Sequence, residues 1–227
     1  MSRSRSKRYD ANLASRPPGP VPTKDAVAAI KSFTIGKFDQ TIELVMHLGI
    51  DPRQAEQALR GSIALPHGIG QTRKVIAFCE EADVENAIGA GAAEAGGDEL
   101  IKKVQDGWTD FDVAVATPSM MKSVSKLGRV LGPTGKMPSP KAGTVSPDVA
   151  ETVKAYVAGK VEYRNDDFGN LHVPVGKMSF DEDKLTENID MFIKYVKKIK
   201  PPSAKGVYMK RVCISGTMTP SVDLEVN

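Results

Sequence analysis

The alternation of apolar and polar residues predicts a half-buried strand over residues 41–48. Every second side chain in this segment is large and apolar, namely Ile42, Leu44, Met46 and Leu48. The positions between them are Thr41, Glu43, Val45 and His47. A period of two places the first row against a core and leaves the second row on the opposite face of a sheet.

Helical spacing flanks this strand on both sides. Thr23 is predicted to cap a short helix, because apolar residues follow it at helical intervals. Asp51 and Pro52 are typical of a helix start and predict a second helix that ends at Gly61. Another strand is expected over residues 63–65.

The middle of the chain, residues 70–158, has a different pattern. Its apolar runs at 75–78 and 113–116 are typical of buried parallel strands. Helical stretches rich in Ala, Glu and Lys lie at 82–89, 98–106, 119–127 and 148–158. Strands and helices that alternate in this way predict an α/β domain of the Rossmann-like, three-layer kind, with helices on both faces of the sheet.

After Gly159 the strand alternation returns. Residues 161–175 predict a β-hairpin with a turn at 166–169, followed by a helix at 181–198 and a strand at 207–215. This set is more similar to the first 66 residues than to the middle. We therefore predict a two-domain α+β fold, in which an α+β outer domain (residues 23–69 and 159–227) receives an inserted α/β domain (residues 70–158).

Residues 1–22 are basic and Pro-rich, and we expect a flexible or partner-ordered arm. The segment has no apolar core for a secretory signal, whereas its Arg and Ser content leaves an organellar transit peptide open. The chain of 227 residues is 41% hydrophobic and 26% charged, with no apolar run long enough for a membrane helix. Two cysteines favour a reducing cytoplasm.

Charge is divided unevenly between the two predicted domains. The outer domain with its arm carries 21 Lys and Arg against 16 Asp and Glu, whereas the inserted domain carries 10 against 12. Seven of the outer cations lie between Asp190 and Asp223, where no acidic residue occurs. Such a run attracts phosphate backbones, although a solvated face is the alternative. A Gly- and Pro-rich loop at 127–145, inside an acid-free window at 113–147, can also present cations to phosphate.

Enzyme and metal motifs do not match. Gly135 and Lys136 are followed by Met137, which breaks a phosphate loop, and Arg73 stands at the third glycine of a dinucleotide motif. The three histidines are scattered without the spacing of zinc ligands. We therefore predict no enzyme activity, no cofactor and no metal.

Seven motifs, in order along the chain, resemble those of the bacterial large-subunit ribosomal protein L-one (uL1) family. They are FDQTIE at 38–43, LPHG at 65–68, DGW at 106–108, LGRVLGP at 127–133, PKAGTV at 140–145, YRND at 163–166 and TM at 217–218. The resemblance implies the inserted two-domain fold and a cytoplasmic protein of the large ribosomal subunit. It further implies binding to ribosomal RNA at the mobile stalk near the tRNA exit site, help in releasing deacylated tRNA, and repression of the protein's own mRNA.

The same resemblance implies site residues. The RNA-binding set would be Lys37, Phe38, Thr41, Glu43, Asn165, Asp166, Ser179, Thr217 and Met218. Hinges between the domains would lie near Gly68, Gly70 and Gly159.

The sequence also departs from the family pattern at four positions, which are Gln71, Thr134, Ser139 and Thr219. Threonine tolerates a positive φ poorly, so Thr219 is expected to affect the C-terminal loop. Two other functions stay open from the residues alone. One is a nucleotide-dependent enzyme that uses the inserted domain, and the other is an mRNA-binding repressor that never joins ribosomes.

Overall fold

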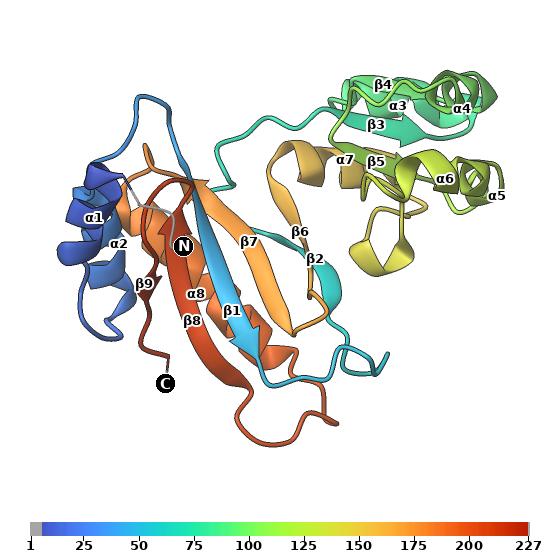
Figure 1. Ribbon diagram of the computed structural model, residues 1–227. Coiled ribbons are helices and arrows are strands. Elements are labelled where there is room, and N and C mark those ends of the chain that lie inside the picture. Colours follow the sequence, from blue (N-terminus) through green and yellow to red (C-terminus); the bar gives the residue numbers. More distant parts are fainter. Residues whose placement is uncertain (1–5, 227) are drawn as a thin grey trace. The chain divides into compact units, whose positions relative to one another are not determined.

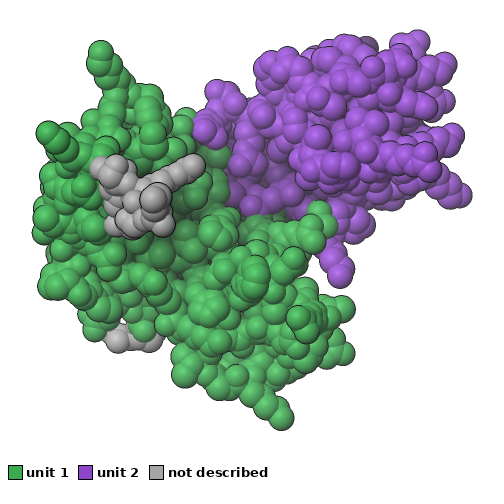
Figure 2. All heavy atoms as spheres, viewed as in Figure 1, with its two compact units in different colours: residues 1–70, 163–227 green, residues 71–162 purple. Residues whose placement is uncertain are grey.

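The structure is a computed structural model and describes residues 6–226 (Figure 1). The chain forms two compact units (Figure 2). Unit 1 combines residues 1–70 with residues 163–227, and unit 2 comprises residues 71–162. The mixed α+β fold class is confirmed, because one unit has an antiparallel sheet built from both ends of the chain and the other has a parallel sheet.

Strand β1 (Thr41–Leu48) is an inner strand of a four-stranded antiparallel sheet in unit 1. The strand order is β7 (Asn170–Lys177), β1, β8 (Met209–Gly216) and β9 (Val222–Asp223). Leu44 of β1 lies opposite Val173 on one side and Ile214 on the other. The sheet thus joins the N-terminal and C-terminal parts of the chain.

Two helices cover one face of this sheet. Helix α2 (Thr23–Ser32) packs against α8 (Glu182–Lys198), and both contact the strands. The apolar row of β1 is 0–1% exposed, and the matching side chains of α8 are equally buried, including Ile189 and Phe192. The strand predicted at 41–48 and its buried face are therefore confirmed. Thr23, however, is the first residue of α2 and gives no side-chain cap; its hydroxyl bonds to Asp190 instead.

The arm differs from the flexible segment that we expected. Residues 7–14 form helix α1 (Lys7–Ala14), whose N-terminus is capped by the Ser6 side chain. Asn12 is buried and exchanges two hydrogen bonds of 3.0 Å with the backbone of Thr34, which ties the helix to unit 1. The first five residues of the arm lie outside the described part of the chain.

The helix predicted from Asp51 to Gly61 is wrong. Residues 52–57 form turns, because the Asp51 carboxylate accepts hydrogen bonds from the Arg53 amide and the Gln54 side chain. A short polar side chain that bonds the nearby backbone in this way competes with helix formation.

The hairpin predicted at 161–175 is also wrong as a pair of strands. Strand β6 (Lys160–Arg164) pairs with β2 (Arg60–Ala64) in a separate two-stranded sheet, while β7 pairs with β1. A turn does join β6 to β7, and one bridge between Asn165 and Leu171 is all that pairs them in the described chain. The choice of partner strand is a long-range effect that local alternation cannot reveal.

Unit 2 contains a parallel sheet with the order β4 (Glu94–Gly96), β3 (Val75–Phe78), β5 (Val113–Ala116). Helices α3 (Glu81–Gly89) and α7 (Val149–Val157) contribute to the core on one face. The core on the other face involves α4 (Asp98–Gln105), α5 (Met121–Val124), α6 (Gly128–Leu131) and the 3₁₀ turn Ser125–Leu127. The strand side chains alternate between the two cores: Val75 and Ala77 face one, Ile76 and Phe78 the other.

Within residues 6–226, no helix combines the length and the apolar character that crossing a membrane requires.

We predict that Gly49→Ala destabilises the protein. A Cβ atom at Gly49, just after β1, would overlap the carbonyl oxygen of Val207, and backbone atoms cannot move aside cheaply. Overpacking of this kind costs about 1–3 kcal/mol in the free energy of unfolding. Chemical denaturation of the variant measures the loss.

Gly89→Ala is the matched control for this prediction. Gly89 ends α3, and no atom beyond its chain neighbours and the backbone of its own helix lies within 4 Å of the place its Cβ would take. An unchanged or slightly higher stability is expected there. Equal stabilities of the two variants would contradict the close approach at Gly49.

Candidate nucleic-acid interface

Three segments meet where β1 begins. Thr41 lies opposite Lys177 at the end of β7, and Ile42 lies opposite Gly216 at the end of β8. Because neighbouring strands run antiparallel, the residues before β1 come together with those after β7 and β8. This end of the sheet brings together six of the nine predicted RNA-binding residues, and Lys177 lies with them. We call them the sheet-end cluster, formed by Lys37, Phe38, Thr41, Lys177, Ser179, Thr217 and Met218.

Buried hydrogen bonds fix the loop that carries Thr217 and Met218. The Gln40 side chain is 0% exposed, and its Oε1 accepts a 2.9 Å bond from the Met218 amide. The Thr217 amide and hydroxyl both donate to the Thr41 carbonyl, at 3.2 and 3.3 Å. The loop is thereby held on the start of β1.

The other side of the cluster is held by Asp39. Its carboxylate accepts bonds from the Ser179 amide at 3.1 Å and from the Ser179 hydroxyl at 2.8 Å. Lys177 Nζ donates to the Thr41 hydroxyl at 2.9 Å, so each of these side chains restrains the position of the other. These polar groups are pre-organised, which lowers the entropy cost of binding a ligand.

Apolar side chains in the same cluster are turned toward solvent. Phe38 is 50% exposed and Met218 is 52% exposed, although both are large hydrophobic residues. Lys37 beside them is exposed. An aromatic ring in such a position can stack on a base or ribose.

Glu43 lies on the uncovered face of the sheet, two residues along β1 from Thr41. Its neighbours across the sheet are Pro174 and Ser215. No ion pair joins it to a lysine in the described part of the chain. The carboxylate is therefore exposed and can accept hydrogen bonds from a ligand.

Asn165 and Asp166 are not part of the cluster. They lie near Asn170, which pairs with His47 at the far end of β1. Asn165 Oδ1 accepts a 2.7 Å bond from the Leu59 amide, and Asp166 accepts bonds from the Phe168 and Asn170 amides. Both side chains are thus engaged in holding the turn between β6 and β7.

The electrostatics of Asp166 agree with a structural use. Burial by itself would raise the pKa of the Asp166 carboxyl, but hydrogen bonds from Asn170 and the Phe168 amide outweigh that effect and hold its pKa below the usual value. The turn is therefore stabilised by the ionised form.

The three predicted hinge glycines all have positive φ, at 61° for Gly68, 67° for Gly70 and 105° for Gly159. The Gly68 carbonyl also accepts a bond from the buried Asn188 side chain of α8. Glycine is needed for these backbone conformations; movement about them stays a prediction.

Thr219 does not strain the C-terminal loop. Within residues 6–226 positive φ values occur only at glycines, and the Thr219 hydroxyl accepts a 2.8 Å bond from the Gly216 amide. The residue is buried and closes the turn after β8. The expected effect of this departure from the family pattern is therefore corrected.

Sequence reasoning missed one residue of the cluster, Lys177, and the two that hold the cluster in place, Asp39 and Gln40. Their roles depend on contacts between distant segments. The arm was missed as well: Arg8 and Tyr9 of α1 line a groove of about 410 Å³ together with residues 217–219. The clustered cations at the start of the arm were the available signal.

Lys136 in the glycine-rich loop of unit 2 is not available to phosphate. Its Nζ donates to the carbonyls of Thr109, at 3.0 Å, and of Phe111. The expectation that the loop can present cations to phosphate therefore does not extend to Lys136.

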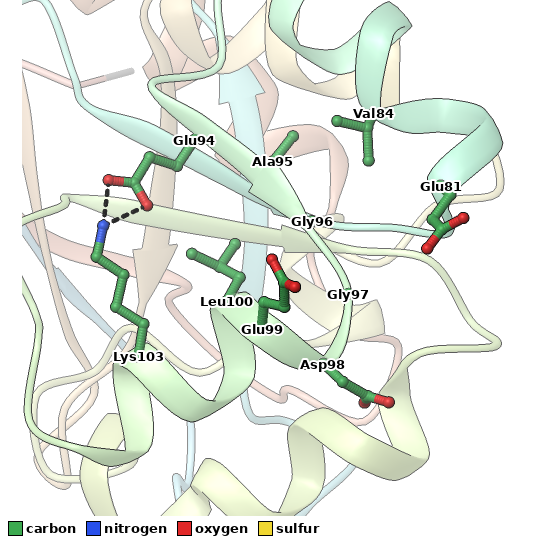
Figure 3. Close-up of a pocket in the computed structure, with 10 residues that line it drawn as sticks. All are labelled: Glu81, Val84, Glu94, Ala95, Gly96, Gly97, Asp98, Glu99, Leu100 and Lys103. Carbon is green, nitrogen blue, oxygen red and sulfur yellow. Dashed lines mark hydrogen bonds and ion pairs between the residues drawn. The ribbon is translucent and has the colours of Figure 1, made fainter.

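Unit 2 has a pocket of about 510 Å³ that is lined by strand β4 and by residues of α3 and α4 (Figure 3). The lining includes Gly96 and Gly97, where β4 ends, and nucleotides often bind beyond the carboxyl ends of strands in α/β domains. Here the lining carries four carboxylates, from Glu81, Glu94, Asp98 and Glu99, and the single lining lysine, Lys103, is paired with Glu94 at 2.6 Å. Negative charge of this kind repels a phosphate. No cluster of three or more metal-binding side chains occurs among residues 6–226.

Comparison with known proteins identifies the family. Residues 30–220 match the profile of the Ribosomal protein L1p/L10e family. The chain belongs to this family. Three proteins named large ribosomal subunit protein uL1 are similar to it. That of Rhodopirellula baltica is 55% identical over 96% of this chain and 97% of its own. Those of Kosmotoga olearia and Chlorobium phaeobacteroides are 51% and 49% identical over 88% of this chain, and over 87% and 88% of their own.

Membership in this family decides between an enzyme and a structural protein. Proteins of the L1 family are structural components of ribosomes and not enzymes, and the chain is therefore a structural protein. The alternative of a nucleotide-dependent enzyme is wrong.

We expect no nucleotide to bind in the acidic pocket of unit 2. ATP, NAD and NADP should leave the thermal midpoint unchanged, because a ligand raises it only by binding the folded state. Thermal denaturation with increasing nucleotide checks this. A saturable rise would contradict the electrostatic argument.

Asp166→Asn is predicted to destabilise unit 1 in a pH-dependent way. Since the folded pKa is lowered, ionised Asp166 stabilises the fold above its usual pKa of 3.8, and this contribution is lost as the pH falls through the lower folded value. The difference in unfolding midpoint between parent and variant should be largest near neutral pH and shrink below pH 3.8. Asp167→Asn, at an exposed neighbour, is the control and should show no such difference.

Proposed function

We propose that the protein is a cytoplasmic component of the large ribosomal subunit and binds large-subunit ribosomal RNA at the mobile stalk near the tRNA exit site. Its relatives are named large ribosomal subunit proteins, which supports its place in the large subunit. The observation that carries RNA binding is the sheet-end cluster, in which exposed Phe38 and Met218 stand beside fixed hydroxyls and amides.

The chemistry of the cluster suits folded RNA. RNA is recognised through its shape, its 2′-hydroxyls and its unstacked bases. The hydroxyls of Thr41, Ser179 and Thr217 are held in position by the protein's own hydrogen bonds. Those of Ser179 and Thr217 donate within the protein and can accept from a ligand, whereas that of Thr41 accepts from Lys177 and can donate to a ligand. Glu43 would accept from ribose hydroxyls or base amines. This part of the surface supplies register and specificity.

Lysines supply the attraction to phosphate. Lys37 is exposed and Lys177 is half-buried in the cluster itself. Arg211, in the acid-free run near the C-terminus, pairs with Asp223 at 2.8 Å, and Asp223 also pairs with Arg16. The three groups together therefore contribute a single positive charge. The remaining members of the run are lysines on α8, on the segment that leads into β8, and at Lys210 within β8.

We infer further functions from the family resemblance. They are help in releasing deacylated tRNA at the exit site and repression of the protein's own mRNA through the same surface. In this proposal Asn165 and Asp166 support the RNA-binding unit by holding its turn. The outer and inserted domains would move about Gly68, Gly70 and Gly159.

The test combines sedimentation with RNA crosslinking. A tagged protein should sediment with large ribosomal subunits, and sequencing of crosslinked RNA should return stalk ribosomal RNA together with the protein's own mRNA. Recovery of the mRNA alone, without sedimentation, would replace the proposal with that of a repressor outside ribosomes. Recovery of neither RNA would contradict both.

Thr217→Val is predicted to weaken binding to a stalk RNA fragment about tenfold, while thermal stability changes little. Valine keeps the shape and removes one hydroxyl, and an RNA group left buried without its hydrogen bond costs about 1–3 kcal/mol. The exposed bond from this hydroxyl to the Thr41 carbonyl is also lost, but that carbonyl still accepts from the residue 217 amide. Since no charge is removed, the slope of log affinity against log salt should not change. Titration at several salt concentrations measures both quantities.

Thr186→Val is the matched control. Thr186 lies on α8, and its hydroxyl bonds within the helix to the Glu182 carbonyl. Its affinity for the RNA fragment should equal that of the parent. Parent-like binding by Thr217→Val would remove Thr217 from the interface.

A further inference from the structure

A helical segment of unit 2 has an outer side made of cations. Helix α5, the 3₁₀ turn and α6 follow one another without a break over residues 121–131. Lys122, Lys126 and Arg129 are exposed at helical spacings of four and three residues. The opposite side is formed by Val124, Leu127 and Leu131, which are 0% exposed in the core of the unit. We call the exposed side, with its three cations, the cationic face.

The stretch of sequence that carries this face contains no acidic residues. Unit 2 has 13 Asp and Glu, and none of them lies between residues 113 and 147. Five of its 11 Lys and Arg do lie there. The unit is slightly acidic as a whole, yet this segment is uniformly basic.

The cations of the face have no partner within the described chain. Two other lysines of unit 2 do have acidic partners: Lys74 pairs with Asp110 at 2.8 Å and Lys103 with Glu94 at 2.6 Å. No ion pair or side-chain hydrogen bond is formed by the three cations of the face among residues 6–226. Like charges four residues apart on a helix repel each other, so the arrangement costs stability. An external anion would compensate for that cost.

The surface between the cations is open. Ser125 and Gly128 separate them, and nothing lies within 4 Å of the position that a Cβ of Gly128 would take. Lys122 and Arg129 are seven positions apart in the sequence, which is roughly 10 Å along a helix axis. A nucleic-acid duplex presents a negative charge about every 1.7 Å along its axis. Several phosphates therefore fall within reach of the three side chains.

We propose that the cationic face is a second RNA-binding surface, which contacts the phosphate backbone without reading sequence. The face has no aromatic ring or side-chain amide, and the contacts that we assign to its three cations are to phosphate, which carries no sequence information. The other anionic ligand that such a face could bind is an acidic segment of a protein. RNA is favoured because its charges are regular and dense, and because the chain belongs to a family of ribosomal proteins. The inference does not depend on the sheet-end cluster.

The test uses the full chain with Lys126→Gln and Arg129→Gln together, titrated with an RNA duplex of arbitrary sequence. Affinity should fall several-fold for every sequence tried. Two lost phosphate contacts should make the slope of log affinity against log salt shallower by about 1.8. Equal thermal midpoints of parent and variant show that the exposed substitutions leave the fold intact.

Lys102→Gln with Lys154→Gln is the matched control, because it removes two exposed cations of unit 2 outside the acid-free window. It should leave affinity and slope close to those of the parent. An unchanged slope in the Lys126 and Arg129 variant would overturn the proposal, and so would an equal loss in the control. The sheet-end cluster is tested separately, by the ratio of affinities for stalk RNA and for arbitrary RNA. Both double variants should keep the parent's preference for stalk RNA, because neither changes the cluster.

A photo-crosslinking residue at position 125 distinguishes the two kinds of occupant. Ser125 is exposed between Lys122 and Arg129. In isolated large ribosomal subunits that contain the protein, we expect adducts with ribosomal RNA. Adducts with protein alone would overturn the assignment to RNA.

Discussion

The pairing of β1 on both of its edges is the constraint on which unit 1 depends. One edge bonds to β7 and the other to β8, although more than 120 residues separate β1 from either strand. These pairings force both ends of the chain into one sheet, whose buried face then packs on α2 and α8. Unit 2 lies between β2 and β7 in the sequence, so the segment 71–162 can form its own core without interrupting this sheet.

The register of the same strand creates the candidate site. Thr41 lies opposite Lys177, and Ile42 lies opposite Gly216. The chain must therefore turn in three places at this end of the sheet: before β1, after β7 and after β8. Turns expose polar backbone groups that need partners. Gln40 and Asp39 supply them by binding the Met218 amide and the Ser179 amide. The hydrogen bonds that satisfy the fold thus also fix the hydroxyls and the exposed apolar groups of the site.

How much of this the sequence could predict depends on the range of the interactions involved. The strand at 41–48 and the helix at 181–198 follow from local periodicity, and the structure has them at Thr41–Leu48 and Glu182–Lys198. The helix expected after Asp51 failed because one carboxylate bonds the backbone beside it. The hairpin failed because β6 takes β2 as its partner, and no local pattern encodes that choice.

The site was predictable to a different degree. The family resemblance supplied Phe38, Thr41, Thr217 and Met218, and the fold does bring these four residues to one end of the sheet. It also supplied Asn165 and Asp166, which lie at the other end of β1. Lys177 was missed because its position beside Thr41 depends on a bulge in the pairing of β1 with β7. A bulge shifts which residue faces which, and sequence alternation alone does not locate it.

The two surfaces of the protein are built on different physical principles. In the sheet-end cluster, the hydroxyls and the loop that carries Met218 are held by internal hydrogen bonds, so the neutral groups that lie beside Lys37 and Lys177 are fixed in direction. On the cationic face of unit 2, long flexible side chains carry full charges and have no ion-pair partner among residues 6–226. Directional neutral contacts discriminate between ligands and are insensitive to salt, whereas unpaired cations attract any phosphate backbone and are screened by salt. A protein that combines the two can associate through charge and be selected through shape.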